Sequence, residues 1–118
     1  MQIIENSKVK EKLYVEKLKN GLTVMIIPKK GIQKKYVIWG TNYGSNDSKF
    51  VVPGEDKETE VPKGVAHFLE HKMFEQESGI NSLDTLTALG VDANAYTTND
   101  HTAYLFECTD NFYEAMDE

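Results

Sequence analysis

Two histidines and a glutamate lie within five consecutive positions of this 118-residue chain, which has three histidines in all. The segment reads GVAHFLEHKMF, and its polar groups are His67, Glu70 and His71. On a helix, residues four apart project from the same side, so both imidazoles can reach one metal ion. Zinc accepts histidine readily, and a catalytic zinc has three protein ligands and an open position for water. We therefore predict that His67 and His71 bind Zn²⁺.

Glu70 directly precedes His71, so its carboxylate reaches the same space without having to bind the metal. At about 100° per residue, the three polar side chains fall within a sector of roughly 100°. This placement suits a general base, because zinc lowers the pKa of water and a nearby acceptor can take the proton. The predicted chemistry is peptide-bond hydrolysis, with Glu70 returning the proton to the leaving amine.

Two plainer interpretations of the motif stay open at this point. A surface helix can carry histidines four positions apart without binding any metal. The metal could also be structural, although structural zinc usually has four protein ligands, often cysteines, and this chain has one cysteine, Cys108.

The motif must sit on a helix for this geometry to hold. Pro62 and Gly64 introduce that helix, which we expect at about residues 64–77. Phe68 and Leu69 fall in the half of the helix opposite the polar groups. We expect this apolar half to pack against a sheet, with the polar groups facing away from it.

The remaining pattern predicts mainly antiparallel strands. Asn20-Gly21 joins two alternating runs and predicts a hairpin. Residues 35–43 predict a third strand with Tyr36 and Trp39 in the core, and residues 46–63 predict a surface loop with at most a short extended piece.

In the second half of the chain, Asn81 or Ser82 can cap a second helix that stops at Gly90. Two strands follow, VDANAYTT and TAYLFECT, and a last helix begins after Thr109 or Asp110. The predicted fold class is α+β (a two-layer α/β arrangement), with a mainly antiparallel sheet and helices on one face. Residues 1–118 are predicted to form a single partial domain, because the chain ends within the pattern of the last helix.

Charge and composition exclude some classes of partner. All 13 basic residues are lysine, so no guanidinium is available to read guanine edges or clamp phosphate. Lysines interleave with apolar residues in the first third, as on the solvated face of strands. We predict no nucleic-acid partner. The apolar runs are too short for a membrane span, and the single cysteine is typical of a reducing compartment. We therefore predict no membrane partner and a cytoplasmic location.

The segment GVAHFLEHKMFE resembles the inverted zinc motif of the pitrilysin/insulinase family of metallopeptidases, the inverzincins. The segments NGLTVMIIPK, TNYGSND and ANAYTTNDHTAYLF also follow in the family's order, so the resemblance covers roughly residues 12–113. The HKMFE ending is similar to a bacterial subgroup of processing zinc proteases. The resemblance implies that His67 and His71 are the first two zinc ligands and that Glu70 is the catalytic base. It also implies that Asn94 and Ala95 lie on a strand that binds an extended substrate.

The family's third zinc ligand is a glutamate about seventy to eighty residues after the second histidine, which lies past Glu118. The resemblance therefore implies an incomplete N-terminal part of a lobe that is inactive alone. Its implied partners are a peptide or unfolded-protein substrate, the rest of the parent chain with a second homologous half, and a homologous non-catalytic subunit. We interpret four other residues as structural: Glu75, Glu77 and Glu107 as surface or strand charges, and His101 as a loop histidine.

The alternative function is a non-catalytic peptide-binding or scaffold subunit of the same family. An intact set of His67, Glu70 and His71 favours the enzyme, because a scaffold needs no general base beside two metal ligands.

Overall fold

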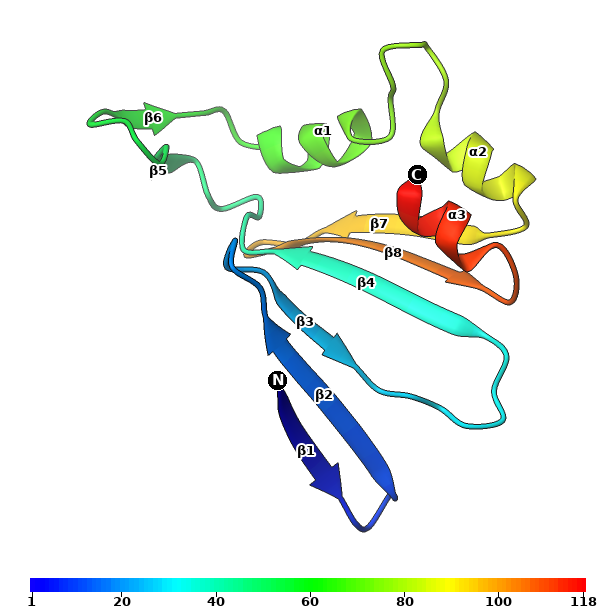
Figure 1. The fold of residues 1–118 in the computed structure, drawn as a ribbon. Coiled ribbons are helices and arrows are strands. Elements are labelled where there is room, and N and C mark those ends of the chain that lie inside the picture. The colour runs from blue at the N-terminus through cyan, green and yellow to red at the C-terminus, as the bar shows by residue number, and fades with distance from the viewer. The chain divides into compact units, whose positions relative to one another are not determined.

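The computed structural model describes all 118 residues and divides into two compact units, Met1–Gln33 and Lys34–Glu118. The first unit is an antiparallel sheet with the strand order β1-β2-β3 (Figure 1). Its strands are β1 (Gln2–Asn6), β2 (Glu11–Lys17) and β3 (Thr23–Ile26). The turn between β2 and β3 holds Asn20-Gly21, and Gly21 has a φ of 91°. This confirms the predicted hairpin, whereas β1 was not expected.

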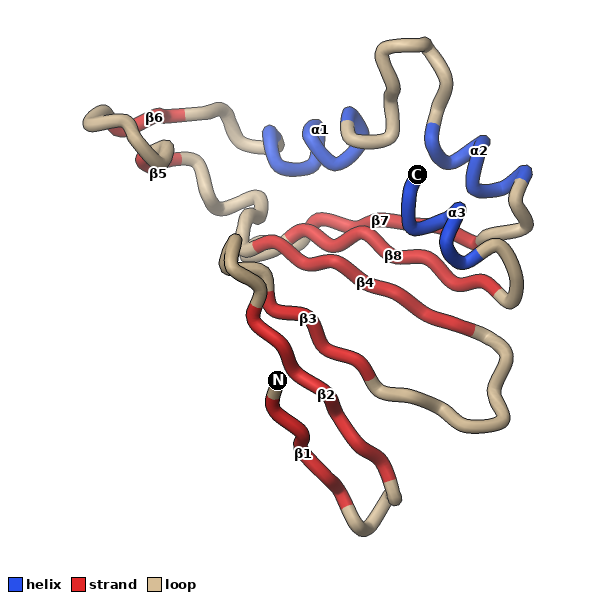
Figure 2. The backbone as a smooth tube through the Cα atoms, viewed as in Figure 1, coloured by secondary structure: helices blue, strands red, loops and turns tan.

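The second unit is built on a three-stranded antiparallel sheet with the order β4-β8-β7. Its strands are β4 (Lys35–Thr41), β8 (Thr102–Cys108) and β7 (Asp92–Thr97), and its helices are α1 (Val65–Lys72), α2 (Ser82–Ala88) and α3 (Phe112–Asp117). All three helices lie on one side of this sheet (Figures 1 and 2). Mixed helices and antiparallel sheets confirm the predicted α+β fold class. None of the three helices has the length and apolarity needed to cross a membrane.

The segment predicted as a loop, residues 46–63, contains more regular structure than expected. It forms a small hairpin of β5 (Lys49–Val51) and β6 (Glu58–Glu60). The hairpin escaped the sequence pattern because its strands have three residues each and one of them, Glu-Thr-Glu, carries no apolar side chain. β6 is stabilised as a strand by its pairing with β5 and not by apolar side chains of its own.

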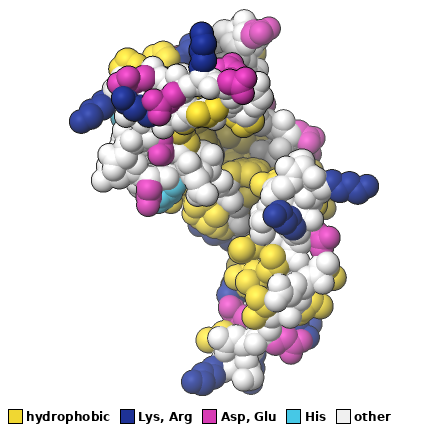
Figure 3. All heavy atoms as spheres, turned by 90° about the vertical axis from the view of Figure 1, so that its left-hand side faces the viewer, with side chains coloured by type: hydrophobic (Ala, Val, Ile, Leu, Met, Phe, Trp, Pro, Cys, Tyr) yellow, Lys and Arg dark blue, Asp and Glu magenta, His cyan; other side chains and the backbone are white.

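The core of the second unit is small and centres on Phe106 of β8, which is 3% exposed. The buried hydrophobic residues around it are Leu86, Val91, Cys108 and Ala115. Cys108 is 4% exposed and packs in this core as a small hydrophobe. The core positions predicted for Tyr36 and Trp39 are wrong: Tyr36 is 58% exposed, and Trp39 touches Phe106 but stays 38% exposed. Hydrophobic side chains reach the surface at several places on the face drawn in Figure 3.

The helix that carries the motif is shorter than predicted. α1 ends at Lys72, not near residue 77, because the next backbone groups pair elsewhere. The Ser82 N–H donates to the Phe74 carbonyl at 2.8 Å, and the Gln76 N–H donates to the Ile80 carbonyl at 3.0 Å. These bonds replace the i→i−4 bonds that would extend a helix.

The other helix boundaries follow local capping. The Asn81 side chain accepts a hydrogen bond from the Leu83 N–H at 2.8 Å, which confirms it as the cap of α2. α3 starts one or two residues later than expected, after Asn111 with a φ of 56°. Asparagine tolerates this left-handed conformation better than most residues, so neither Thr109 nor Asp110 is the cap.

Candidate metal centre

The candidate site lies on α1, which begins directly after Gly64. Gly64 has a φ of 92°, a conformation that favours glycine because a Cβ would clash with the backbone. The Phe68 N–H donates to the Gly64 carbonyl at 2.9 Å and closes the first turn. The helix therefore starts at Val65, two residues before His67, so that both histidines lie on regular helical backbone.

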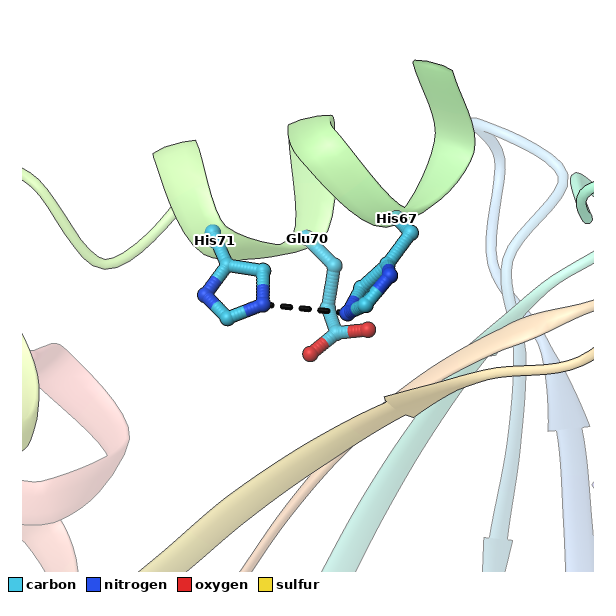
Figure 4. A group of neighbouring side chains, drawn as sticks. All are labelled: His67, Glu70 and His71. Atoms are coloured by element: carbon cyan, nitrogen blue, oxygen red, sulfur yellow. Dashed lines mark hydrogen bonds between the residues drawn. The ribbon is translucent and has the colours of Figure 1, made fainter. Parts of the chain in front are cut away.

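The two imidazoles converge as the i,i+4 spacing predicts. Their Nε2 atoms are 3.0 Å apart, and candidate ligand atoms of His67, Glu70 and His71 all lie within 4.8 Å of one another. Figure 4 shows the three side chains projecting from one side of α1, with the carboxylate between and below the two rings. The sequence prediction that these groups share one space agrees with this geometry.

The pair of nitrogens fits a zinc ion with little movement. Two histidine nitrogens at about 2.05 Å from a tetrahedral zinc are about 3.3 Å apart. The observed 3.0 Å thus needs to open by only about 0.3 Å, which a small rotation of either ring supplies. Both imidazoles are exposed, so an ion can reach them from solvent.

Glu70 is held differently from the histidines, because only 7% of it is exposed. Its Oε2 accepts a hydrogen bond of 2.6 Å from the Thr97 hydroxyl of β7. That length is typical of a hydroxyl bound to an ionised carboxylate. The carboxylate also acts on Tyr104 of β8: burial, and secondly the Glu70 charge, raise the pKa of the Tyr104 phenol.

The predicted orientation of α1 is wrong. Phe68 and Leu69 were expected to face the sheet, yet they are 63% and 44% exposed, and Met73 at the end of the helix is 69% exposed. The buried residues of α1 are Ala66, a member of the apolar half that is 3% exposed, and Glu70, which was expected to face away from the sheet. Periodicity identifies which residues share a helix face and not which face is covered. Here small Ala66 permits close approach, and the Thr97 hydroxyl offsets the desolvation of Glu70.

Asn94 and Ala95 lie in the middle of β7, an edge strand of the sheet. The Asn94 side-chain oxygen accepts a hydrogen bond from the Ala95 N–H at 2.9 Å. Side chains alternate along a strand, so Ala95 shares a face with Thr97, while Asn94 belongs to the opposite, exposed set. The structure thus brings this strand beside α1 through Thr97.

The other acidic residues and His101 do not join the group. Glu75 pairs with Lys72, and Glu107 pairs with Lys34 at 2.6 Å. His101 lies in the β7–β8 turn, where its Nδ1 is 2.6 Å from Asp100 Oδ1. Sequence reasoning missed Thr97 because nothing in the run Tyr96-Thr97-Thr98 distinguishes the hydroxyl that reaches Glu70.

Comparison with known proteins gives evidence on the family of this chain that does not depend on the geometry of the site. Residues 50–117 match the model of the insulinase family, peptidase family M16. The chain is 46% identical over 108 residues to the uncharacterized zinc protease YmfH of Bacillus subtilis, covering 92% of this chain and 25% of that protein. An M16-like peptidase structure from Alicyclobacillus acidocaldarius superposes with a TM-score of 0.81 and 36% identity, over 96% of this chain and 25% of that one.

A more distant relative is core protein I of the ubiquinol-cytochrome-c reductase complex of Euglena gracilis, 40% identical over 58 residues, which cover 47% of this chain and 12% of that protein. The chain spans about a quarter of the length of YmfH. The family match extends over more than half of the chain and includes the helix with both histidines. The chain therefore belongs to the insulinase family of peptidases, M16.

Proposed function

We propose that this chain is the N-terminal segment of a zinc-dependent metalloendopeptidase that hydrolyses peptide bonds. The observation that carries the proposal is the convergence of His67, Glu70 and His71, whose ligand atoms lie within 4.8 Å of one another. Family membership and the similarity to a named zinc protease support it. His67 and His71 would hold the ion through Nε2.

In this proposal, bound zinc would polarise the substrate carbonyl and acidify the attacking water. Glu70 accepts the proton of that water on the carboxylate oxygen that Thr97 does not bind. It then returns the proton to the leaving amine, as a general acid.

The substrate would lie in extended form along β7. Edge strands offer unpaired backbone N–H and C=O groups, which bind a peptide with little demand on its side chains. Asn94 and Ala95 lie on that strand, which runs beside α1 through the bond from Thr97 to Glu70. A peptide or an unfolded protein can adopt this conformation, so these are the proposed substrates.

The proposed third zinc ligand is a glutamate outside residues 1–118. The 25% coverage of YmfH leaves room for it and for a second homologous half. The exposed Phe68, Leu69 and Met73 also fit a helix whose outer face is covered by other parts of a larger protein. A cytoplasmic location stays a prediction from the single cysteine.

Replacing Glu70 tests the proposal. In the full-length protein, Glu70→Gln should reduce cleavage of a fluorogenic peptide by more than about 100-fold while zinc content stays at the wild-type value, because the amide does not accept the proton. Glu75→Gln, a surface change on the same segment, should retain activity. Wild-type cleavage by Glu70→Gln would show that the base lies elsewhere.

A non-catalytic scaffold subunit is the alternative function. It is favoured by the similarity to core protein I, whose name places it in the ubiquinol-cytochrome-c reductase complex. The two functions differ in one measurement: a scaffold would bind peptide without cleaving it, even with zinc present and a homologous subunit added. Any cleavage that is lost in Glu70→Gln would exclude the scaffold.

A further inference from the structure

The Glu70 carboxylate has one hydrogen-bond partner among the side chains, Thr97. The helix face that carries it is covered by β7, and only 7% of the residue stays exposed. A carboxylate that leaves water needs a donor to offset its lost hydration. The Thr97 hydroxyl supplies one at 2.6 Å from Oε2.

The direction of this bond follows from the chemistry of the two groups and from the distances to the neighbouring threonine. Thr102 is opposite Thr97 in the β7–β8 register, and its hydroxyl donates to the Tyr43 carbonyl at 2.8 Å. The Thr97 oxygen is 3.4 Å from the Thr102 hydroxyl but 2.6 Å from Glu70 Oε2. The single proton of the Thr97 hydroxyl is therefore directed at Glu70, which as a carboxylate can only accept.

The backbone around Thr97 is fixed from two sides. The Thr98 N–H donates to the His101 carbonyl at 2.8 Å and closes the β7–β8 turn, and the Ser45 N–H donates to the Thr98 carbonyl at 2.9 Å. Gly44 packs so tightly on that turn that a Cβ would lie 2.4 Å from the Asp100 nitrogen. The hydroxyl therefore projects from a rigid strand end and not from a mobile loop.

We propose that Thr97 is a positioning residue for Glu70: it holds Oε2 and thereby leaves Oε1 directed at the space between the two imidazoles. The inference rests on the proposed function, since positioning matters only if Glu70 is the base. Without the hydroxyl, the carboxylate can rotate about its side-chain bonds and spends less time in the productive orientation. Loss of the Thr97 hydroxyl should therefore slow the chemical step and leave substrate binding and metal binding unchanged.

The test compares Thr97→Val with Thr97→Ser in the full-length protein. Valine keeps the shape and removes the donor, so kcat should fall about 10- to 100-fold, as for loss of a hydrogen bond to a charged group. KM and zinc content should stay within about twofold of wild type, because neither depends on this bond. Serine retains the donor and should keep kcat within about threefold of wild type.

Thr87→Val is the matched control. Its hydroxyl donates to the Leu83 carbonyl within α2 at 2.7 Å, so the same chemical change is made away from Glu70 and kcat should not change. If Thr97→Val does not fold, Thr97→Cys replaces it, since the thiol is a weaker donor and should give an intermediate kcat.

The outcomes separate this inference from the proposed function. Wild-type kcat in Thr97→Val, or an equal loss in Thr97→Ser, would overturn the positioning of Glu70 by Thr97 while leaving the peptidase intact. Loss of zinc in Thr97→Val would also overturn it, because the threonine would then support the metal site. Full activity in Glu70→Gln would instead remove the proposed function itself.

Discussion

At the scale of single residues, the site consists of three side chains with different environments. His67 and His71 are exposed, with their Nε2 atoms 3.0 Å apart, whereas Glu70 is buried and hydrogen-bonded. This division suits the proposed chemistry, because metal ligands must be reachable from solvent and a base benefits from a fixed, partly dry position.

Removal of one imidazole should remove the metal. In the full-length protein, His71→Ala should lower zinc affinity by more than about 100-fold, since even partners that only orient a ligand are worth about 10- to 100-fold. Metal analysis after dialysis measures this. His101→Ala is the control and should keep its zinc, because that ring contacts Asp100 and Thr98 in a turn. A fully loaded His71→Ala protein would contradict the assignment.

At the scale of elements, one short helix and one strand end create the site. α1 begins at the left-handed Gly64 and ends where residues 74–76 turn to pair with residues 80–82. That pairing leads directly into α2, whose cap is Asn81. The residues that end α1 and the residues that cap α2 therefore form one local structure.

Loss of the α2 cap should loosen that helix. Asn81→Ala removes the acceptor of the Leu83 N–H and should cost about 1 kcal/mol. Protection of the α2 amides from hydrogen exchange in the full-length protein should then fall about fivefold, if they exchange through local opening. Asn81→Asp keeps the acceptor and should retain protection. Equal protection in the alanine variant would show that tertiary packing alone holds α2.

At the scale of the whole molecule, residues 1–118 supply part of what a catalytic zinc site needs. The structure groups two imidazoles and one carboxylate, and one oxygen of the carboxylate accepts a hydrogen bond from Thr97. Two histidines alone leave a zinc ion short of the three protein ligands of a catalytic site. The segment should therefore differ from the full-length protein in metal affinity.

The 118-residue chain by itself should bind zinc more weakly than about 1 µM and should not cleave peptides, because the proposed third ligand lies outside residues 1–118. Calorimetric titration at neutral pH measures the affinity, and the full-length protein serves as the control with tight binding. Tight one-to-one binding by the short chain would mean that it contains a third ligand. Glu70 would be the first candidate for that ligand, and zinc titration of Glu70→Gln would test it.

Much of the fold could be predicted because its signals are local. Asn20-Gly21 marked a hairpin, Asn81 marked a helix start, and alternation marked β7 and β8. The length of α1 and the β5–β6 hairpin could not be predicted in the same way. Both depend on backbone pairing between residues that the sequence pattern does not connect.

The sequence by itself determined that His67, Glu70 and His71 converge, because helical geometry places residues i, i+3 and i+4 on one side whatever surrounds them. Only the tertiary structure decided which side of α1 lies on the sheet. It covered Ala66 and Glu70 and left Phe68 and Leu69 exposed, although the apolar pattern predicted that Phe68 and Leu69 would be covered and Glu70 would not. The physical reason is that a hydroxyl from a distant strand, on Thr97, compensates the buried carboxylate.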